Sequence, residues 1–396
     1  LLESTTSEPK NKTYTNEEEE EKEEEEEDDY SGLRGKKTKK KKNTKNVKKG
    51  YNSKKFTFEK EKYDDLWNKI FDACLGLTVV GIFYMIRGVE KFRNTLISLN
   101  PSYEFSKYSD FLICIPSIIC FSIFKYYSQK FLIKVCEKIM KKSYRFPKTE
   151  KDRELGEKYR YKLPIHAFKG TMYTILTLLG YYILKDLNYY PKSLLGKGWL
   201  PNMFIKGYPN SFYLEKPPLF DLYYMICLSY FSADMIWLLF INDRQSDFIN
   251  MLLHHICTIS LIVFSHLVHY SNVGSIVLII HVETDIFVHL TRFLLQTDVP
   301  EIFKNLSGII LVFNFLYIRV YVLGDIIYVL YHYVTWKGVI DWFLLIFLSI
   351  IYLMHINWAI MLVQKMIVLF MGTKLTDTRE YKIKEKDSKQ INSKKQ

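Results

Sequence analysis

Two segments, SDFINMLLHHICT at residues 246–258 and GSIVLIIHVETD at residues 274–285, decide the fold of this chain. Both belong to apolar runs that are long enough to cross a membrane. Two adjacent histidines interrupt the first run, and a histidine with two acidic residues interrupts the second. An ionised side chain at the bilayer centre costs roughly 2.5–3.5 kcal/mol, so such groups usually face the interior of a helix bundle and act there. The two segments therefore predict a pair of membrane helices that hold a buried reaction site.

Further apolar runs on both sides of this pair predict an all-α polytopic membrane protein. About 20 apolar residues are needed to cross roughly 30 Å of hydrocarbon. By this measure the chain of 396 residues contains about eight transmembrane helices. They are predicted at about 66–86, 109–126, 167–185, 219–241, 248–269, 273–296, 306–331 and 339–368.

The charge of the loops predicts the orientation of these helices. Both ends of the chain and the loop at 127–166 are rich in Lys and Arg, whereas the segments at 270–272 and 332–338 are nearly uncharged. Cytosolic loops carry the excess of basic residues in membrane proteins. Eight spans place the basic segments on one face, so we expect both termini to be cytosolic. Since no signal-peptide pattern precedes the polar head, we expect the first span to act as the targeting signal.

The polar ends of the chain are predicted to be disordered. Acidic residues occupy twelve of the thirteen positions at 17–29, and lysines occupy nine of the fourteen at 36–49. Such blocks repel themselves and resist folding. The basic block could bind RNA or an anionic membrane face, but we favour a solvated extension and expect no nucleic-acid partner.

These patterns divide the chain into four parts. Residues 1–65 form a disordered acidic and basic cytosolic extension, and residues 66–157 hold two transmembrane helices and a basic cytosolic loop. Residues 158–371 are expected to hold six further transmembrane helices and the buried reaction site, and residues 372–396 form a charged cytosolic tail.

The tight turn expected at Ser271-Asn272 brings the polar groups of the two central helices together. At 1.5 Å per residue, His254 lies roughly 9 Å from the cytosolic start of its helix and Asp285 roughly 16 Å from the cytosolic end of the next. His281 and Asp285 are four residues apart and share a helical face. His254 and His255 point about 100° apart, so only one of them can aim squarely at the cavity.

Two kinds of chemistry fit this group of side chains. Histidines with a carboxylate could ligate zinc or iron, although a membrane di-iron hydroxylase would need more histidines than the nine present here. Alternatively, a neutral imidazole can accept a proton or an acyl group, while a carboxylate fixes its tautomer. We favour the second chemistry, with no metal, and a lipid substrate suits a site at membrane depth.

The same residues resemble a known family, the ceramide synthases, which are TLC-domain proteins. The two quoted segments are similar to the longevity-assurance motif of that family. The similarity to the family extends over about 158–371, which the resemblance marks as the TLC catalytic domain. Outside the two quoted segments it rests on Trp199, Gly207-Tyr208-Pro209, Tyr223-Tyr224, Tyr230-Phe231-Ser232, Phe315 with Arg319, and Leu353-Met354-His355-Ile356-Asn357-Trp358.

The resemblance implies a fold, an activity and a location. It implies that six helices form a TLC-type barrel around an intramembrane site in the endoplasmic-reticulum membrane. It also implies sphingosine N-acyltransferase activity, in which a fatty acyl group passes from acyl-CoA to the amine of a long-chain base. Acyl-CoA would be a co-substrate and no bound cofactor is expected. The expected partners are these two substrates and the bilayer, with a homodimer or an accessory subunit as a further possibility.

The resemblance also carries roles onto individual residues. The predicted catalytic residues are His254, His255, His281 and Asp285. The predicted substrate-binding residues are Trp199, Tyr223, Tyr224, Arg292 and Arg319. We favour His254 as the reacting residue, with His255 as its support.

Three positions depart from the family pattern. The usual His-Asp dipeptide is His281-Val282, and the later Glu and Lys positions hold His289 and Arg292. The missing acidic residue favours a rival interpretation, a TLC protein that binds, senses or moves lipid without catalysis. The intact histidine pair favours an enzyme.

Overall fold

The computed structural model describes residues 53–99, 101, 106–204, 216–241, 248–333 and 338–371. Within these ranges the chain forms helices and helical turns, with no β-strand. The prediction of an all-α fold is therefore confirmed. Most of the predicted extension at 1–65 and the predicted tail at 372–396 lie outside the described residues, as does the Gly207-Tyr208-Pro209 motif.

Seven helical segments in the described ranges are long and apolar enough to cross a membrane. They are Asp65–Leu99, Tyr108–Ile139, Phe220–Phe240, Phe248–Leu267, Ser271–Leu295, Glu301–Tyr333 and Val339–Phe370. The number predicted was about eight, and the difference is the run at 167–185. This run is helical, but Lys169, two glycines and several Thr and Tyr residues dilute its apolar side chains.

The N-terminal helices extend well beyond the predicted spans. Helix α2 covers Ser53–Leu99, α3 covers Cys114–Ile139 and α5 covers Glu150–Leu184, with the single turn α4 at Lys142–Arg145 between the last two. The segment 127–166, expected to be a basic loop, is therefore helical over most of its length. Lysines do not end a helix at the membrane surface, because their long stems let the charged ends reach water.

The central pair of helices is α7, Phe248–Leu267, and α8, Ser271–Leu295. The turn between them is Val268–Tyr270, so Ser271 and Asn272, expected in the turn, begin α8 instead. His269 in this turn has a φ of 63°, which reverses the chain direction within three residues. The antiparallel pairing predicted for these helices is confirmed by their mutual contacts.

The remaining helices surround this pair. Helix α6 covers Phe220–Phe240, α9 covers Glu301–Phe315, α10 covers Leu323–Tyr333 and α11 covers Val339–Phe370. A π-helical segment, Leu316–Val322, joins α9 to α10 without a break.

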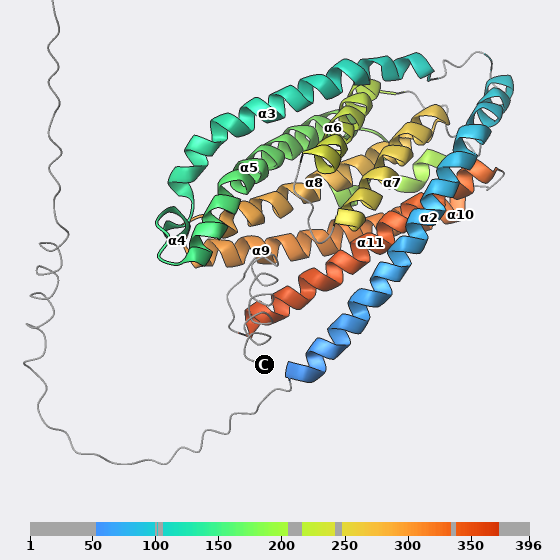
Figure 1. The fold of residues 1–396 in the computed structure, drawn as a ribbon. Coiled ribbons are helices and arrows are strands. Elements are labelled where there is room, and N and C mark those ends of the chain that lie inside the picture. Colours follow the sequence, from blue (N-terminus) through green and yellow to red (C-terminus); the bar gives the residue numbers. More distant parts are fainter. Residues whose placement is uncertain are drawn as a thin grey trace, which may run out of the picture. The chain divides into compact units, whose positions relative to one another are not determined.

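Helix α8 contacts α5, α7 and α9, as Figure 1 shows, and α7 also contacts α6 and α11. Helix α3 runs along α5 and α6. Side chains of α2, among them Phe71 and Cys74, pack in one cluster with residues of α7 and α11. A closed barrel of six helices stays a prediction.

Candidate active site

Three histidines from three helices meet inside the bundle. They are His254 of α7, His281 of α8 and His355 of α11, all at most 6% exposed. Their ring centroids are 5.6 Å apart for His254 and His281, 5.0 Å for His281 and His355, and 6.0 Å for His254 and His355. The predicted meeting of His254 with His281 is therefore present in the structure. We call these three residues the histidine cluster.

Hydrogen bonds fix the proton positions of two of these rings. His281 Nδ1 lies 2.7 Å from the carbonyl oxygen of Val277, which can only accept, so Nδ1 carries the proton. The lone pair of neutral His281 is then on Nε2, which has no hydrogen-bond partner among the described residues. His355 Nε2 lies 3.4 Å from Arg319 Nη1, which can only donate. His355 thus accepts from Arg319.

Arg319 ties the cluster to Asp285. Its Nη2 donates to Asp285 Oδ1 at 2.5 Å and to the carbonyl oxygen of His281 at 2.8 Å. The side chain is 3% exposed and comes from the π-helical segment. Single π turns inside helices are frequently found at functional sites, because they redirect side chains. Asp285 was predicted to orient a histidine, and in the structure its side chain pairs with Arg319.

The histidine cluster could hold a metal ion by geometry alone. One nitrogen from each ring lies within 4.8 Å of the others. However, the guanidinium of Arg319 donates to His355, so the other nitrogen of a neutral His355 carries a proton and cannot ligate. The positive charge of Arg319 also opposes a second cation. The donor set therefore fits a hydrogen-bonded cluster better than a metal site.

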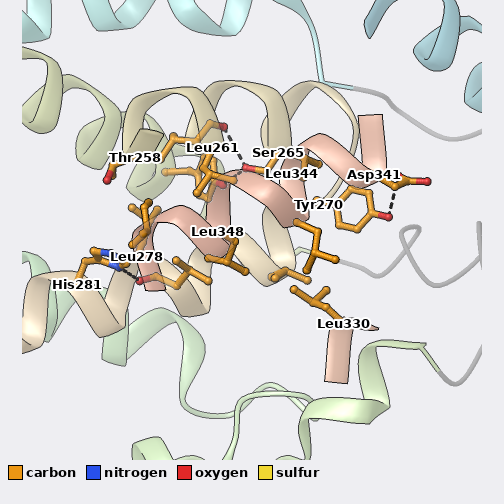
Figure 2. Close-up of a pocket in the computed structure, with 17 residues that line it drawn as sticks. Thr258, Leu261, Ser265, Tyr270, Leu278, His281, Leu330, Asp341, Leu344 and Leu348 are labelled. Carbon is orange, nitrogen blue, oxygen red and sulfur yellow. Dashed lines mark hydrogen bonds between the residues drawn. The ribbon is translucent and has the colours of Figure 1, made fainter. Parts of the chain in front are cut away.

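An apolar cavity leads away from the histidine cluster. Its volume is about 60 Å³, well below the roughly 300–1,000 Å³ of typical ligand pockets, so a long ligand requires the lining side chains to move apart. Figure 2 shows His281 and Thr258 at one end, Tyr270 and Asp341 at the other, and leucines between them. At the far end the hydroxyl of Tyr270 donates to Asp341 Oδ1 at 3.0 Å. The apolar lining suits a long apolar group whose reactive end is at His281.

The second motif histidine, His255, faces a different set of groups. Its Nε2 lies 3.7 Å from Asp234 Oδ2 of α6. Asp234 also pairs with Lys125 of α3 at 3.0 Å and with Lys169 of α5 at 2.7 Å. We call Asp234, Lys125 and Lys169 the charge cluster. The two motif histidines are thus divided between the histidine cluster and the charge cluster, as their 100° separation predicts.

His289, one of the positions that depart from the family pattern, packs near these groups. Its Nδ1 lies 3.1 Å from His166 Nδ1 of α5, and its ring stacks on Tyr173 at a centroid distance of 5.5 Å. This contact joins α8 to α5.

The five predicted substrate-binding residues lie in different surroundings. Tyr224 lines the cavity and its hydroxyl lies 2.5 Å from Ser265 Oγ. Tyr223 is buried between α6 and α5, with its hydroxyl against Gly180. Trp199 is 61% exposed in the segment between α5 and α6, and Arg292 is half-buried near the end of α8. Arg319, as described, belongs to the cluster itself.

Sequence reasoning missed three residues that the structure brings to these sites. His355 appears in the sequence analysis only within the flanking stretch that ends at Trp358, and no role in the site was predicted for it. Trp358 contacts both His254 and His355, at centroid distances of 5.5 and 5.8 Å. Asp234 and Lys125 were not considered, although each is a charged residue within a predicted apolar span. Their position in the span was the signal that could have identified them.

Comparison with known proteins agrees with the motif reading. A model of the TLC domain family matches residues 162–364, half of the chain. The ceramide synthase hyl-2 of Caenorhabditis elegans is 23% identical over 54% of this chain and 61% of its own length. The sphingosine N-acyltransferase lag1 of Schizosaccharomyces pombe is 27% identical over 52% of this chain and 54% of its own length.

A plant relative, ceramide synthase 1 LOH3 of Arabidopsis thaliana, is 32% identical over 25% of this chain and 32% of its own length. The chain therefore spans between a third and three fifths of the length of these curated relatives.

Proposed function

The chain belongs to the TLC-domain family, and from this premise we propose that it is a sphingoid-base N-acyltransferase. The reaction transfers a fatty acyl group from acyl-CoA to the amine of a long-chain base and yields a ceramide. The single observation that carries this proposal is the position of His281, which stacks on His254, at the end of an apolar cavity within the membrane-spanning bundle. The substrate class, a sphingoid base, is proposed from the similarity to the ceramide synthase hyl-2 and the sphingosine N-acyltransferase lag1.

The cavity supports an acyl chain as the occupant. Its lining is almost wholly apolar, and the hydroxyl groups of Tyr224 and Ser265, which lie between its two polar ends, bond to each other. Burial of an acyl chain there gains roughly 0.8 kcal/mol for each methylene that leaves water. The thioester carbon would then lie beside His281 and His254.

The histidines supply the proton chemistry of the transfer. The amine nitrogen forms a bond to the acyl carbon, the bond between that carbon and the CoA sulfur breaks, and one amine proton passes through the histidines to the thiolate. His254 either removes this proton or takes the acyl group first, as an acyl-imidazole, before the amine attacks. His281, with its lone pair on Nε2, lies beside His254. Arg319 donates to His355, the third member of the histidine cluster.

We further propose a location and a topology. The protein would reside in the endoplasmic-reticulum membrane. Helix α5 would join the seven candidate spans as the eighth, so that both termini lie in the cytosol, where acyl-CoA enters. The parts at 66–157 and 158–371 would act together, because α3 contacts α5 and α6.

A non-catalytic lipid-binding protein is the second candidate, and Val282 is the observation in its favour. The longevity-assurance motif that this chain resembles has an acidic residue at this position, whereas Val282 is fully buried in the apolar core. Such a protein would bind lipid in the same cavity but transfer nothing.

Purified protein in detergent, mixed with sphinganine and a panel of acyl-CoAs, separates the two candidates. Mass spectrometry should detect ceramide for wild type and for His332→Ala, whose side chain is exposed and remote from the histidine cluster. His254→Ala should form at least about 100-fold less product, since general acid-base catalysis contributes that much. Lipid that co-purifies with a wild-type protein unable to form ceramide would favour the binding protein.

A further inference from the structure

We infer that Asp234 is the positioning carboxylate for the motif histidine His255. This inference deepens the proposed function and rests on it. It assigns a role to a residue of α6 that lies outside both quoted motif segments, and it makes α3 a part of the reaction site.

Asp234 is held in place from two sides. Its Oδ1 accepts from Lys125 Nζ at 3.0 Å, and its Oδ2 accepts from Lys169 Nζ at 2.7 Å. Lys125 also lies over the ring of Trp237, 4.5 Å from its centroid. Because each oxygen has its own lysine, the carboxylate cannot rotate freely. Oδ2 is therefore fixed at 3.7 Å from His255 Nε2.

A buried imidazole that carries a proton needs a negative charge nearby. The proposed transfer moves one proton through the histidines, and burial of an isolated cation is costly. The other acidic side chains of the site are engaged elsewhere: Glu283 accepts from Asn314 at 2.7 Å, and Asp285 accepts from Arg319 at 2.5 Å. Among the described residues, no other carboxylate oxygen lies within 4.0 Å of a motif histidine.

The composition of the charge cluster also argues for a functional role. Replacing buried ion pairs by apolar residues is often neutral or stabilising, so the burial of Lys125 with Asp234 is weakly explained by stability. Lys125, Asp234 and His255 are each about 5% exposed. Lys125 comes from α3, which precedes the family match at 162–364.

The alternative is a purely structural role, in which Asp234 of α6 only neutralises Lys125 of α3 and Lys169 of α5 and links the three helices. A charge-balanced pair of variants separates the two roles. Asp234→Asn alone raises the net charge of the cluster from +1 to +2, and adding Lys125→Met returns it to +1. The double variant thus keeps the net charge of the wild type but lacks the carboxylate beside His255.

The experiment measures ceramide formation and thermal stability in detergent for wild type, Lys125→Met, Asp234→Asn and Lys125→Met/Asp234→Asn. Asp186→Asn, in an exposed ion pair with Lys197, is the control for a lost surface charge. If Asp234 positions His255, the double variant should recover stability relative to Asp234→Asn, while its kcat stays about 100-fold below wild type with little change in KM. Lys125→Met, which keeps Asp234 beside His255, should lose much less.

Other outcomes overturn the inference in distinguishable ways. A double variant as active as Lys125→Met would show that the carboxylate is only structural, and the proposed function would stand. Asp234→Glu that is no more active than Asp234→Asn, in a stably folded protein, would also argue against a positioning carboxylate. A wild-type protein without any turnover would overturn the proposed function and this inference together.

Discussion

Val282 shows how a departure from a motif is accommodated by its surroundings. The longevity-assurance motif that this chain resembles has an acidic side chain here, but Val282 is completely buried among apolar residues of the core. Its neighbour Glu283 points to Asn314 on α9 and does not take its place. The side chain at this position therefore contributes apolar packing and no charge.

Restoring the acid at this position should therefore harm the protein. Val282→Asp places a carboxyl group among the apolar side chains that surround Val282, a change expected to cost about 2 kcal/mol or more of folding free energy. We expect a lower Tm in detergent and no gain in turnover. Val282→Ile, which keeps the apolar character, is the control. A faster and equally stable Val282→Asp enzyme would contradict this account.

At the scale of single residues, the sequence identified the histidines better than their partners. Adjacent histidines in an apolar run are conspicuous, and their 100° separation predicted that they would face different groups. Partners such as His355 and Asp234 are isolated polar residues in separate helices. Their meeting depends on helix packing, which local sequence does not encode.

The π-helical segment Leu316–Val322 is the element that delivers Arg319 to the site. The segment continues α9 into α10, so no loop or proline marks it in the sequence. Arg319 links the histidine cluster to Asp285 through hydrogen bonds to three acceptor atoms, one each from His355, His281 and Asp285. Removal of one partner from a buried ion pair costs about 3–5 kcal/mol, because it leaves the other charge uncompensated.

Arg319→Met should consequently destabilise the protein strongly, since it leaves Asp285 without its guanidinium. The double variant Arg319→Met/Asp285→Asn should be more stable than Arg319→Met alone, although both lack turnover. Thermal unfolding in detergent measures this difference. Equal Tm values for the single and double variants would show that the pair contributes little.

The cavity between α7, α8 and α11 should set the length of the acyl chain. Leu278 lies on its wall, about one helical turn from His281 toward Tyr270. Leu278→Trp would fill the space beyond the reactive end. We expect the ratio of rates for long over short acyl-CoAs to fall about tenfold, a ratio that is independent of the amount of folded enzyme.

Leu290→Trp on the exposed face of the same helix is the matched control for this prediction. It adds the same side chain to α8 without entering the cavity, so its chain-length profile should equal that of the wild type. An unchanged profile for Leu278→Trp would mean that the acyl chain lies elsewhere.

At the scale of elements, hydropathy predicted the positions of the seven candidate spans but not their ends. The apolar core of a span is visible in the sequence, whereas α2, α3 and α5 continue past it into polar residues. Lysine, glutamate and arginine are good helix formers, so a helix does not stop where the membrane does. The basic segment at 127–166 was misjudged as a loop for this reason.

For the whole molecule, the unit defined by helix packing is larger than the segment matched by the family model. The family match begins at residue 162, within α5, whereas the buried charge cluster also needs Lys125 of α3. Helix α2 likewise packs on α7 and α11, with Thr78 Oγ1 3.4 Å from Cys257 Sγ. The multi-pass membrane unit therefore includes helices that precede the matched domain.

The measurement that tests the central claim most directly is a joint assay of ceramide and free CoA with purified wild type and His254→Ala. The account predicts equal amounts of both products from sphinganine and acyl-CoA with the wild type, and neither with a folded His254→Ala variant. Equal turnover by the two proteins would contradict a reaction at the histidine cluster. No ceramide from a wild-type protein that still binds acyl-CoA would contradict the assignment as an acyltransferase.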